Sequence, residues 1–196
     1  SNQIHMEVEM RALYVIDMNK AFGKGSPLAV DGAEEIIEGV NRLMAEGYQG
    51  DPFDVILASY EEHQKANRYL ASTYKVEPNT RVTVNGIEVY CWVEHAMTGT
   101  SEVEPLDGVR IELFNAIFRK GWDHYEHPYS SMMALLMYGS IETKMTAIEY
   151  LKKRGITELV IVGLAYDFCV GETALEAVKH FKVTVIKSLT GSVFPE

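Results

Sequence analysis

The sequence predicts an α/β protein: a three-layer sandwich in which a mostly parallel central sheet is flanked by helices. Short apolar runs alternate with amphipathic segments along the chain, which is the pattern of βαβ units. The chain has 196 residues, of which 47% are hydrophobic and 23% charged, and this suits one globular domain. With no internal repeat in the sequence, we expect a single domain spanning 1–196.

The predicted elements follow one another in the order that a βαβ protein needs. Apolar runs predict strands at 12–16, 55–58, 116–119, 159–162 and 183–186. Helical spacing of apolar residues predicts helices at 31–45, 143–154 and 169–181. Asp31 is the expected N-cap of the first helix, and Gly47 and Gly155 are the expected ends of the first two. Asn85-Gly86 predicts a tight hairpin turn between 82–84 and 87–92, inside a small insertion at about 61–108.

Charge and composition exclude several classes of partner. The formal net charge is −10, so we expect neither a nucleic acid nor an anionic membrane surface as partner. No apolar stretch is long enough to span a bilayer, and the polar, charged start of the chain does not resemble a signal peptide. The two cysteines do not make a disulfide framework. We therefore expect a cytoplasmic protein that acts on a small molecule.

Four reactive side chains follow predicted parallel strands. Asp17, Glu61, Lys120 and Cys169 all lie at or just past the carboxyl ends of these strands. Open α/β sheets bind their ligands at that edge. The sequence therefore predicts that the four residues converge on one site.

Cys169 is the candidate nucleophile. It follows a strand and a tight turn and is expected to open a helix, where the helix dipole would lower the pKa of its thiol. A lone cysteine is otherwise most often a small buried hydrophobe. Asp17 could be a loop cap and Lys120 a surface charge, but together with Cys169 they form a triad. In it Lys120 offsets the negative charges and Asp17 transfers the proton.

Three segments resemble the motifs of the isochorismatase-like cysteine hydrolases, in order along nearly the whole chain. They are Val15–Asn19, Phe118–Gly121 and Gly163–Val170. The resemblance implies that family's fold, a thioester formed by the Asp–Lys–Cys triad, and release of ammonia from an amide. It also implies a cis peptide bond at Leu164–Ala165 and an oxyanion hole made by the backbone N–H groups of Ala165 and Cys169.

A candidate metal site lies after the second predicted strand. Glu61 and His63 are two residues apart, so both can face one cation from an extended segment, and His95 could add a third ligand. One carboxylate and two imidazoles suit Zn, Fe or Mn. On spacing alone, a Glu-x-His pair is more often solvated surface.

Resemblance to the nicotinamidases favours a metal site over a solvated surface at these residues. The segments Ala58–His63 and Trp92–Thr100 are similar to those in which these enzymes hold their metal and their ring-binding aromatic residue. The resemblance implies one divalent metal ion, zinc first among the candidates, held by Glu61, His63 and His95. It also implies that Phe22 and Trp92 clamp the pyridine ring of the substrate.

The chain departs from the family pattern at several positions. Glu61 replaces the family's Asp, and Asn67 stands where a further His is common. Asn19, Ala21 and Tyr166 replace Gln, Asp and Thr, and relatives continue into a closing helix where this sequence ends. None of these changes touches the triad. They bear on the metal geometry and on the choice of substrate.

Three functions remain open from the sequence. The first is a metal-dependent nicotinamidase that also hydrolyses analogues such as pyrazinamide. The second is a metal-free amidase of the same superfamily acting on ureido or carbamoyl substrates, and the third is a non-catalytic binding module. The intact triad argues against the third, and the metal-site residues separate the first two. The resemblance further implies assembly as a homo-oligomer.

The remaining cysteine, two histidines and three methionines are expected to have structural or surface positions instead of catalytic ones. Cys91 is expected to serve packing or to have no role in the site. His124 and His127 could line the mouth of the pocket, but the simpler expectation is that they are surface histidines. Met132, Met133 and Met137 have near-helical spacing and are expected in the core or at a subunit interface.

Overall fold

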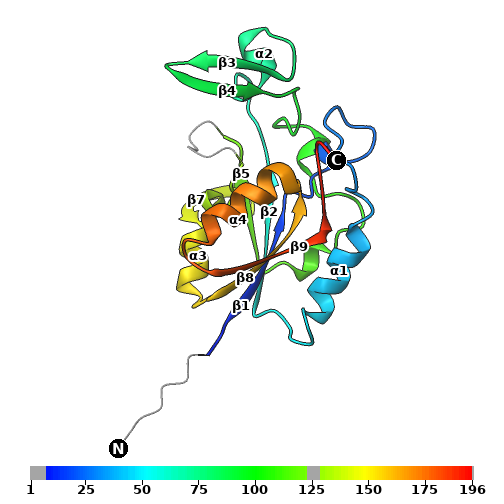
Figure 1. Ribbon diagram of the computed structural model, residues 1–196, viewed down its shortest axis with the longest axis vertical. Helices are drawn as coiled ribbons and strands as arrows, with labels where there is room; N and C mark the ends of the chain where they lie inside the picture. Colours follow the sequence, from blue (N-terminus) through cyan, green and yellow to red (C-terminus); the bar gives the residue numbers. More distant parts are fainter. Residues whose placement is uncertain (1–7, 123–128, 196) are drawn as a thin grey trace, which may run out of the picture.

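The computed structural model describes residues 8–122 and 129–195, and most of them surround a central β-sheet (Figure 1). In this described part, seven strands form the sheet in the order β7-β6-β5-β2-β1-β8-β9. The parallel strands are β1 (Arg11–Ile16), β2 (Val55–Glu61), β5 (Ala116–Lys120), β8 (Glu158–Leu164) and β9 (Lys182–Gly191). The strands β6 (Leu135–Tyr138) and β7 (Ile141–Thr146) pair antiparallel at one edge.

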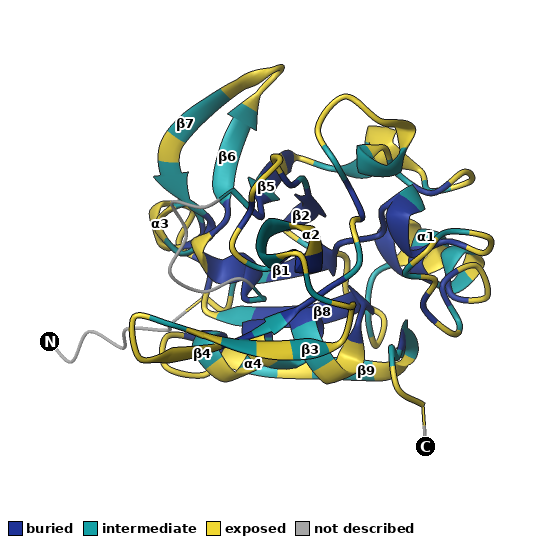
Figure 2. Ribbon diagram, turned by 90° about the horizontal axis from the view of Figure 1, so that it is seen from above, coloured by how far each residue is buried: buried dark blue, intermediate teal, exposed yellow. Residues whose placement is uncertain are grey.

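Helices cover both faces of the sheet, which confirms the predicted three-layer architecture (Figures 1 and 2). Leu13 and Val15 of β1 belong to a core that contains buried residues of α1 (Ile37–Glu46). Tyr14 and Ile16, which point the other way, belong to a second core formed with α3 (Ala147–Lys153) and α4 (Gly171–Ala177). Alternate residues of one buried strand thus serve two cores.

A smaller unit lies above the carboxyl end of the main sheet (Figure 1). It contains α2 (Ala71–Tyr74) and the hairpin of β3 (Thr80–Val84) and β4 (Ile87–Cys91). Asn85 and Gly86 have φ of 50° and 78°, as a primed turn requires. Cys91 is fully buried in a cluster with Ala71 and Val89, so its expected packing role is confirmed.

The first predicted helix starts later than expected. It was expected to begin at Asp31, whereas α1 begins at Ile37. Gly32 has φ of +88°, which no α-helix accommodates, and the backbone of Asp31 pairs with that of Ser192. Gly47 ends the helix as predicted, and its N–H donates to the carbonyl of Leu43.

The other two predicted helices are also shorter. Residues 143–146 belong to β7, and Thr146 is the N-cap of α3, accepting from the N–H of Glu149 at 3.2 Å. The segment predicted to be helical from Cys169 begins instead with a π-helical turn, Tyr166–Val170, and α4 ends at Ala177. Both errors lie at element boundaries.

The three methionines with near-helical spacing lie in different elements. Met132 is buried in the 3-10 segment η4 (Ser131–Met133), Met133 is 38% exposed, and Met137 lies in β6, so these methionines share no helix. His124 and His127 lie outside the described residues. The other 3-10 segments are η1 (Lys20–Phe22), η2 (Ser101–Val103) and η3 (Ile111–Leu113).

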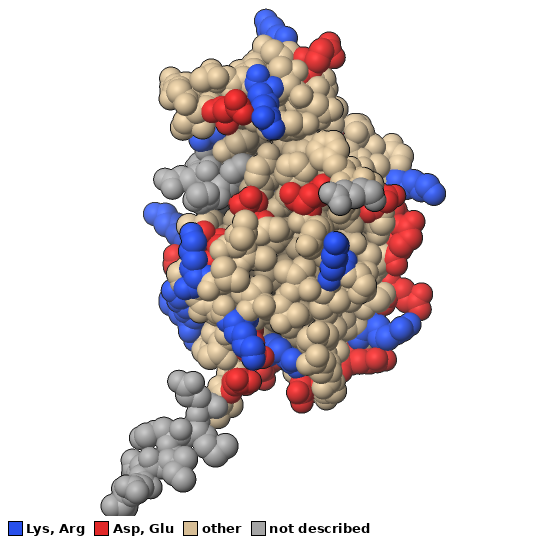
Figure 3. Space-filling view, viewed as in Figure 1, with Lys and Arg blue, Asp and Glu red and all other residues tan. Residues whose placement is uncertain are grey.

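The described helices are all too short or too polar to cross a membrane. On the face seen in Figure 3, Lys and Arg side chains are scattered among Asp and Glu. The surface on that side therefore has mixed charge.

Candidate active site

The carboxyl ends of four parallel strands bring the predicted reactive residues together. Asp17 directly follows β1, Glu61 and Lys120 are the last residues of β2 and β5, and Cys169 lies beyond β8. Glu61 and Lys120 are partners in the strand register. The sequence predicted this convergence from strand endings alone.

Lys120 lies between a carboxylate and a thiol. Its Nζ is 2.8 Å from Asp17 Oδ2 and donates to Cys169 Sγ at 3.1 Å and to the carbonyl of Tyr129 at 2.9 Å. Glu61 Oε1 is 3.6 Å from the same nitrogen. Asp17, Lys120 and Cys169 are 0%, 1% and 6% exposed. The three side chains form a buried group in which the Lys120 ammonium contacts both the Asp17 carboxylate and the Cys169 thiol.

Burial and mutual charge set the protonation of this group. Burial would lower the pKa of the Lys120 ammonium, but the charges of Asp17, Cys169 and Glu61 outweigh it and raise that pKa well above its ordinary value. Burial raises the pKa of the Cys169 thiol well above the usual range, although Lys120 opposes this shift. Burial likewise raises the pKa of Asp17. The sequence led us to expect a lowered pKa for this thiol, but burial raises it instead.

A chain of buried hydroxyl groups supports the triad. Ser59 Oγ donates to Asp17 Oδ1 at 2.8 Å and lies 2.8 Å from Ser131 Oγ. The N–H of Ser131 donates to Thr173 Oγ1 at 2.8 Å, and Thr173 Oγ1 donates to the carbonyl of Cys169 at 2.6 Å. Ser59, Ser131 and Thr173 are fully buried. Sequence reasoning missed these residues, because serine and threonine carry no signal of their own at such positions.

The turn that carries Cys169, Ala165–Val170, is referred to below as the Cys169 turn. The peptide bond Leu164–Ala165 that enters it is cis, as the resemblance implies. The carbonyl of Ala165 accepts from the N–H groups of Phe168 and Val170, at 3.1 and 2.9 Å. Cys169 therefore lies inside a π-helical turn instead of opening an α-helix.

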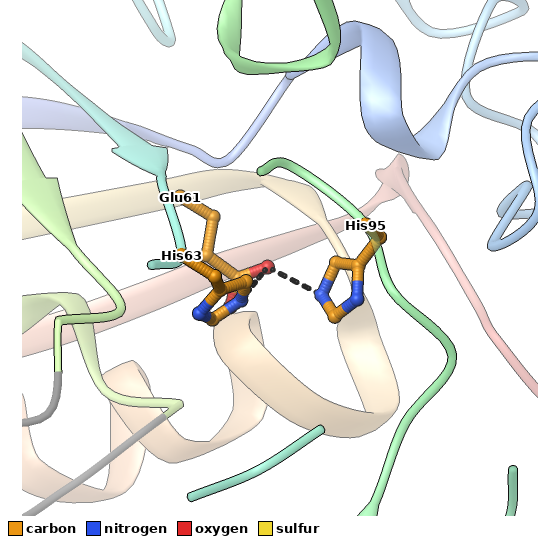
Figure 4. Close-up of side chains that lie close together, drawn as sticks. All are labelled: Glu61, His63 and His95. Atoms are coloured by element: carbon orange, nitrogen blue, oxygen red, sulfur yellow. Dashed lines mark hydrogen bonds and ion pairs between the residues drawn. The ribbon is translucent and has the colours of Figure 1, made fainter. Parts of the chain in front are cut away.

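Glu61, His63 and His95 converge on one point beside the triad (Figure 4). Glu61 Oε2 is 3.2 Å from His95 Nε2 and 3.5 Å from His63 Nε2. Their ligand atoms all lie within 4.8 Å of one another, and the three residues are 4–5% exposed. The sequence predicted this set from spacing and resemblance, and the structure brings its members together.

The histidine tautomers suit metal ligation. His63 Nδ1 donates to the carbonyl of Gly121 at 2.9 Å, and His95 Nδ1 donates to that of Val93 at 2.7 Å, since a carbonyl can only accept. Metal binding uses the neutral form of each ring, in which Nε2 is the unprotonated nitrogen and can share a cation with Glu61. Among the described residues, His63 Nε2 is buried without a hydrogen-bond partner. A divalent cation would satisfy that atom, so the donor set fits a metal.

Neighbouring residues hold these ligands in place. Asn19 donates to the carbonyl of Glu61 at 3.1 Å and accepts from its N–H at 3.0 Å, which fixes the end of β2. Asn67 donates to the carbonyl of Gly121 at 2.7 Å and accepts from the N–H of Tyr69 at 3.0 Å. Asn67 thus supports the carbonyl that orients His63. A Cβ at Gly121 would lie 2.9 Å from His63 Cε1, so this position needs glycine.

A pocket joins the triad to the candidate metal ligands. Its lining includes Cys169 and Ala165 together with all three of Glu61, His63 and His95. Aromatic walls come from Phe22, Tyr69, Trp92, Tyr129 and Phe168, and aliphatic ones from Leu28, Val30 and Val193. The sequence singled out Phe22 and Trp92 but missed the other aromatic residues. Such a cavity suits a flat ring that carries an amide.

The fold and this site define a class, the α/β cysteine hydrolases that act on amides. Residues 140–196 match the family model described as the isochorismatase domain. The chain is 34% identical to the nicotinamidase of Acinetobacter baylyi over 170 residues, covering 86% of this chain and 74% of the relative. The chain belongs to the nicotinamidase family.

Solved structures agree with this assignment. A nicotinamidase/pyrazinamidase of Acinetobacter baumannii superposes with a TM-score of 0.80 at 29% identity, covering 97% of this chain and 88% of that one. A pyrazinamidase of Pyrococcus horikoshii, whose structure is a zinc complex, has a TM-score of 0.70 at 21% identity. It covers 94% of this chain and 88% of its own, and this likeness concerns the fold.

Proposed function

We propose that the chain is a metal-dependent nicotinamidase that hydrolyses nicotinamide, and pyrazinamide as an analogue, to the acid and ammonia. The observation that carries this proposal is the position of Lys120 Nζ, which lies 2.8 Å from Asp17 Oδ2 and 3.1 Å from Cys169 Sγ. The pocket that Cys169 lines is also lined by the Glu-His-His group. The names of the relatives support the substrate.

Acylation begins at Cys169. Its Sγ forms a bond to the carboxamide carbon while the thiol proton passes to Asp17, whose own raised pKa favours accepting it. Lys120 stays protonated and offsets the charge of the group. The oxyanion accepts hydrogen bonds from the backbone N–H groups of Ala165 and Cys169. Asp17 then returns the proton to the carboxamide nitrogen, ammonia leaves, and a thioester remains.

Deacylation reuses the same groups. A water molecule adds to the thioester carbon while Asp17 takes its proton. The C–S bond then breaks, the proton returns to Cys169, and the pyridine carboxylic acid is released. Asp17 thus ends each turnover in the state in which it began, and no other proton donor is required.

Glu61, His63 and His95 would hold one divalent cation, with zinc the first candidate and iron or manganese compatible with the donor set. The bound ion would supply a coordination position for the ring nitrogen of a pyridine or pyrazine. Phe22 and Trp92 would clamp the ring from the pocket walls. The zinc complex of the Pyrococcus horikoshii relative supports this choice of metal.

The test is ammonia release from nicotinamide, pyrazinamide and a carbamoyl amide, together with elemental analysis of unchelated protein. Cys169→Ala should abolish ammonia release with an unchanged circular dichroism spectrum. Cys91→Ala, which removes the other buried thiol, should retain turnover. Turnover by Cys169→Ala would contradict the nucleophile. Full activity without metal, or preference for the carbamoyl amide, would favour the metal-free amidase.

A further inference from the structure

We propose that Asp167 is a positioning residue that holds the C-terminal segment 192–194 against the Cys169 turn, so that Val193 forms a wall of the substrate pocket. The proposal rests on the proposed function only for the choice of substrate. Asp167 Oδ1 accepts from the N–H of Val193 at 2.9 Å, and Oδ2 accepts from the N–H of Phe194 at 2.8 Å. One side chain thus binds two successive backbone amides.

The other end of this segment is held by backbone pairing. The N–H of Asp31 donates to the carbonyl of Ser192, and the N–H of Ser192 donates back, both at 3.2 Å. A Cβ at Gly191 would lie 2.4 Å from the carbonyl oxygen of Asp31, so glycine permits this close approach. The segment therefore runs from the loop that contributes Leu28 and Val30 to the pocket, across to the Cys169 turn.

Asp167 acts through Val193 and not on the reacting atoms. The pocket is lined by Ala165, Phe168 and Cys169 of the turn, and by Val193, but not by Asp167. The segment also meets the turn through the ring of Phe194, which is 56% exposed and 6.0 Å from that of Phe168, and Val193 packs against the core cluster that contains Ala165. Hydrogen bonds to a carboxylate are stronger than neutral ones. Loss of the carboxylate should release Val193 from its place in the wall.

The first test does not depend on activity. Amide hydrogen exchange of the peptide containing Val193 and Phe194 is measured in the wild type, in Asp167→Ala and in Glu172→Ala. Glu172 is an exposed acid in the first turn of α4, so its variant loses the same charge without touching the segment. Exchange should rise about tenfold or more in Asp167→Ala and stay unchanged in Glu172→Ala. Unchanged exchange in Asp167→Ala would overturn the proposal.

The second test is kinetic. In Asp167→Ala the KM for nicotinamide should rise about 3- to 30-fold with kcat within about twofold, because a wall contact binds substrate and transition state alike. Val193→Ala should raise KM similarly, and the double variant should be no worse than Val193→Ala. A fall in kcat at constant KM, or additive effects, would overturn the proposal. If the wild type leaves nicotinamide intact, the proposed function fails while the exchange test still stands.

Discussion

Replacing Lys120 by methionine should destabilise the fold by leaving buried charge uncompensated. The substitution keeps most of the apolar stem and removes the cation that lies 2.8 Å from Asp17 Oδ2 and 3.6 Å from Glu61 Oε1. Both carboxyl groups are at most 5% exposed, so water cannot replace the ammonium. Removing one partner of a buried ion pair costs about 3–5 kcal/mol. That is a large share of the roughly 5–15 kcal/mol that stabilises a typical domain.

Urea unfolding followed by circular dichroism measures this loss. With a slope of about 2 kcal/mol per molar urea, the midpoint should fall by about 1.5–2.5 M. A metal chelator is added to every sample, so that bound metal does not contribute to the measured free energy of unfolding. Lys182→Met is the matched control, because Lys182 pairs with Glu158 at 3.0 Å but is 75% exposed. An exposed pair contributes at most about 1 kcal/mol.

A second substitution tests the cause. Combining Lys120→Met with Asp17→Asn removes one of the uncompensated carboxylates and should recover about 0.5–3 kcal/mol of the loss, the size of coupling between contacting residues. The reasoning would be refuted if Lys120→Met unfolded within about 1 kcal/mol of the wild type, below the range for a broken buried pair. It would also be refuted if the double variant were no more stable than Lys120→Met.

Two further substitutions test the support of the site. Ser59→Ala removes the hydroxyl that donates to Asp17 Oδ1 at 2.8 Å, and should lower kcat/KM in ammonia release about 10- to 100-fold with the fold retained; wild-type activity would contradict a role for this bond. Gly163→Ala would place a Cβ 2.2 Å from Ile16 O at φ of +110°, so its thermal midpoint should fall far below that of Gly50→Ala, where φ is +83° and no atom lies within 4 Å. Equal midpoints would show that the contact is harmless.

The fold class and the site edge were predictable because both follow from repeating patterns. Four of the parallel strands are apolar runs that end in, or are followed by, a reactive residue, and parallel strands align those ends. The boundaries were less predictable, because tertiary contacts set them. Asp31 looks like a helix cap in the sequence, yet its backbone pairs with Ser192, more than 150 residues away. Helical spacing likewise predicted a helix over 143–154, although the residues up to Thr146 belong to a strand.

Residues that act by hydrogen bonding to the site escaped prediction for a different reason. The sequence presents Ser59, Thr173 and Asp167 as ordinary polar residues, and their partners come from other elements. Asp167 was visible only as part of a motif, because its two acceptors bind backbone amides of a segment 26 and 27 residues further along. Backbone donors leave no trace in a sequence. Contacts of this kind can be found only once the chain is folded.

Glu61 stands where the resemblance places an aspartate in the family, and the geometry shows which groups its longer side chain reaches. One oxygen of Glu61 lies 3.6 Å from Lys120 Nζ, while the other lies 3.2 Å from His95 Nε2 and 3.5 Å from His63 Nε2. The carboxyl group therefore bridges the triad and the candidate metal ligands. Lys120 and His63 hold the pKa of Glu61 well below its usual value, although burial opposes them. Asn19 fixes the backbone of Glu61 from both sides, so the longer side chain starts from a defined point. A glutamate at the end of β2 thus reaches both groups, and the substitution is compatible with the proposed metal site.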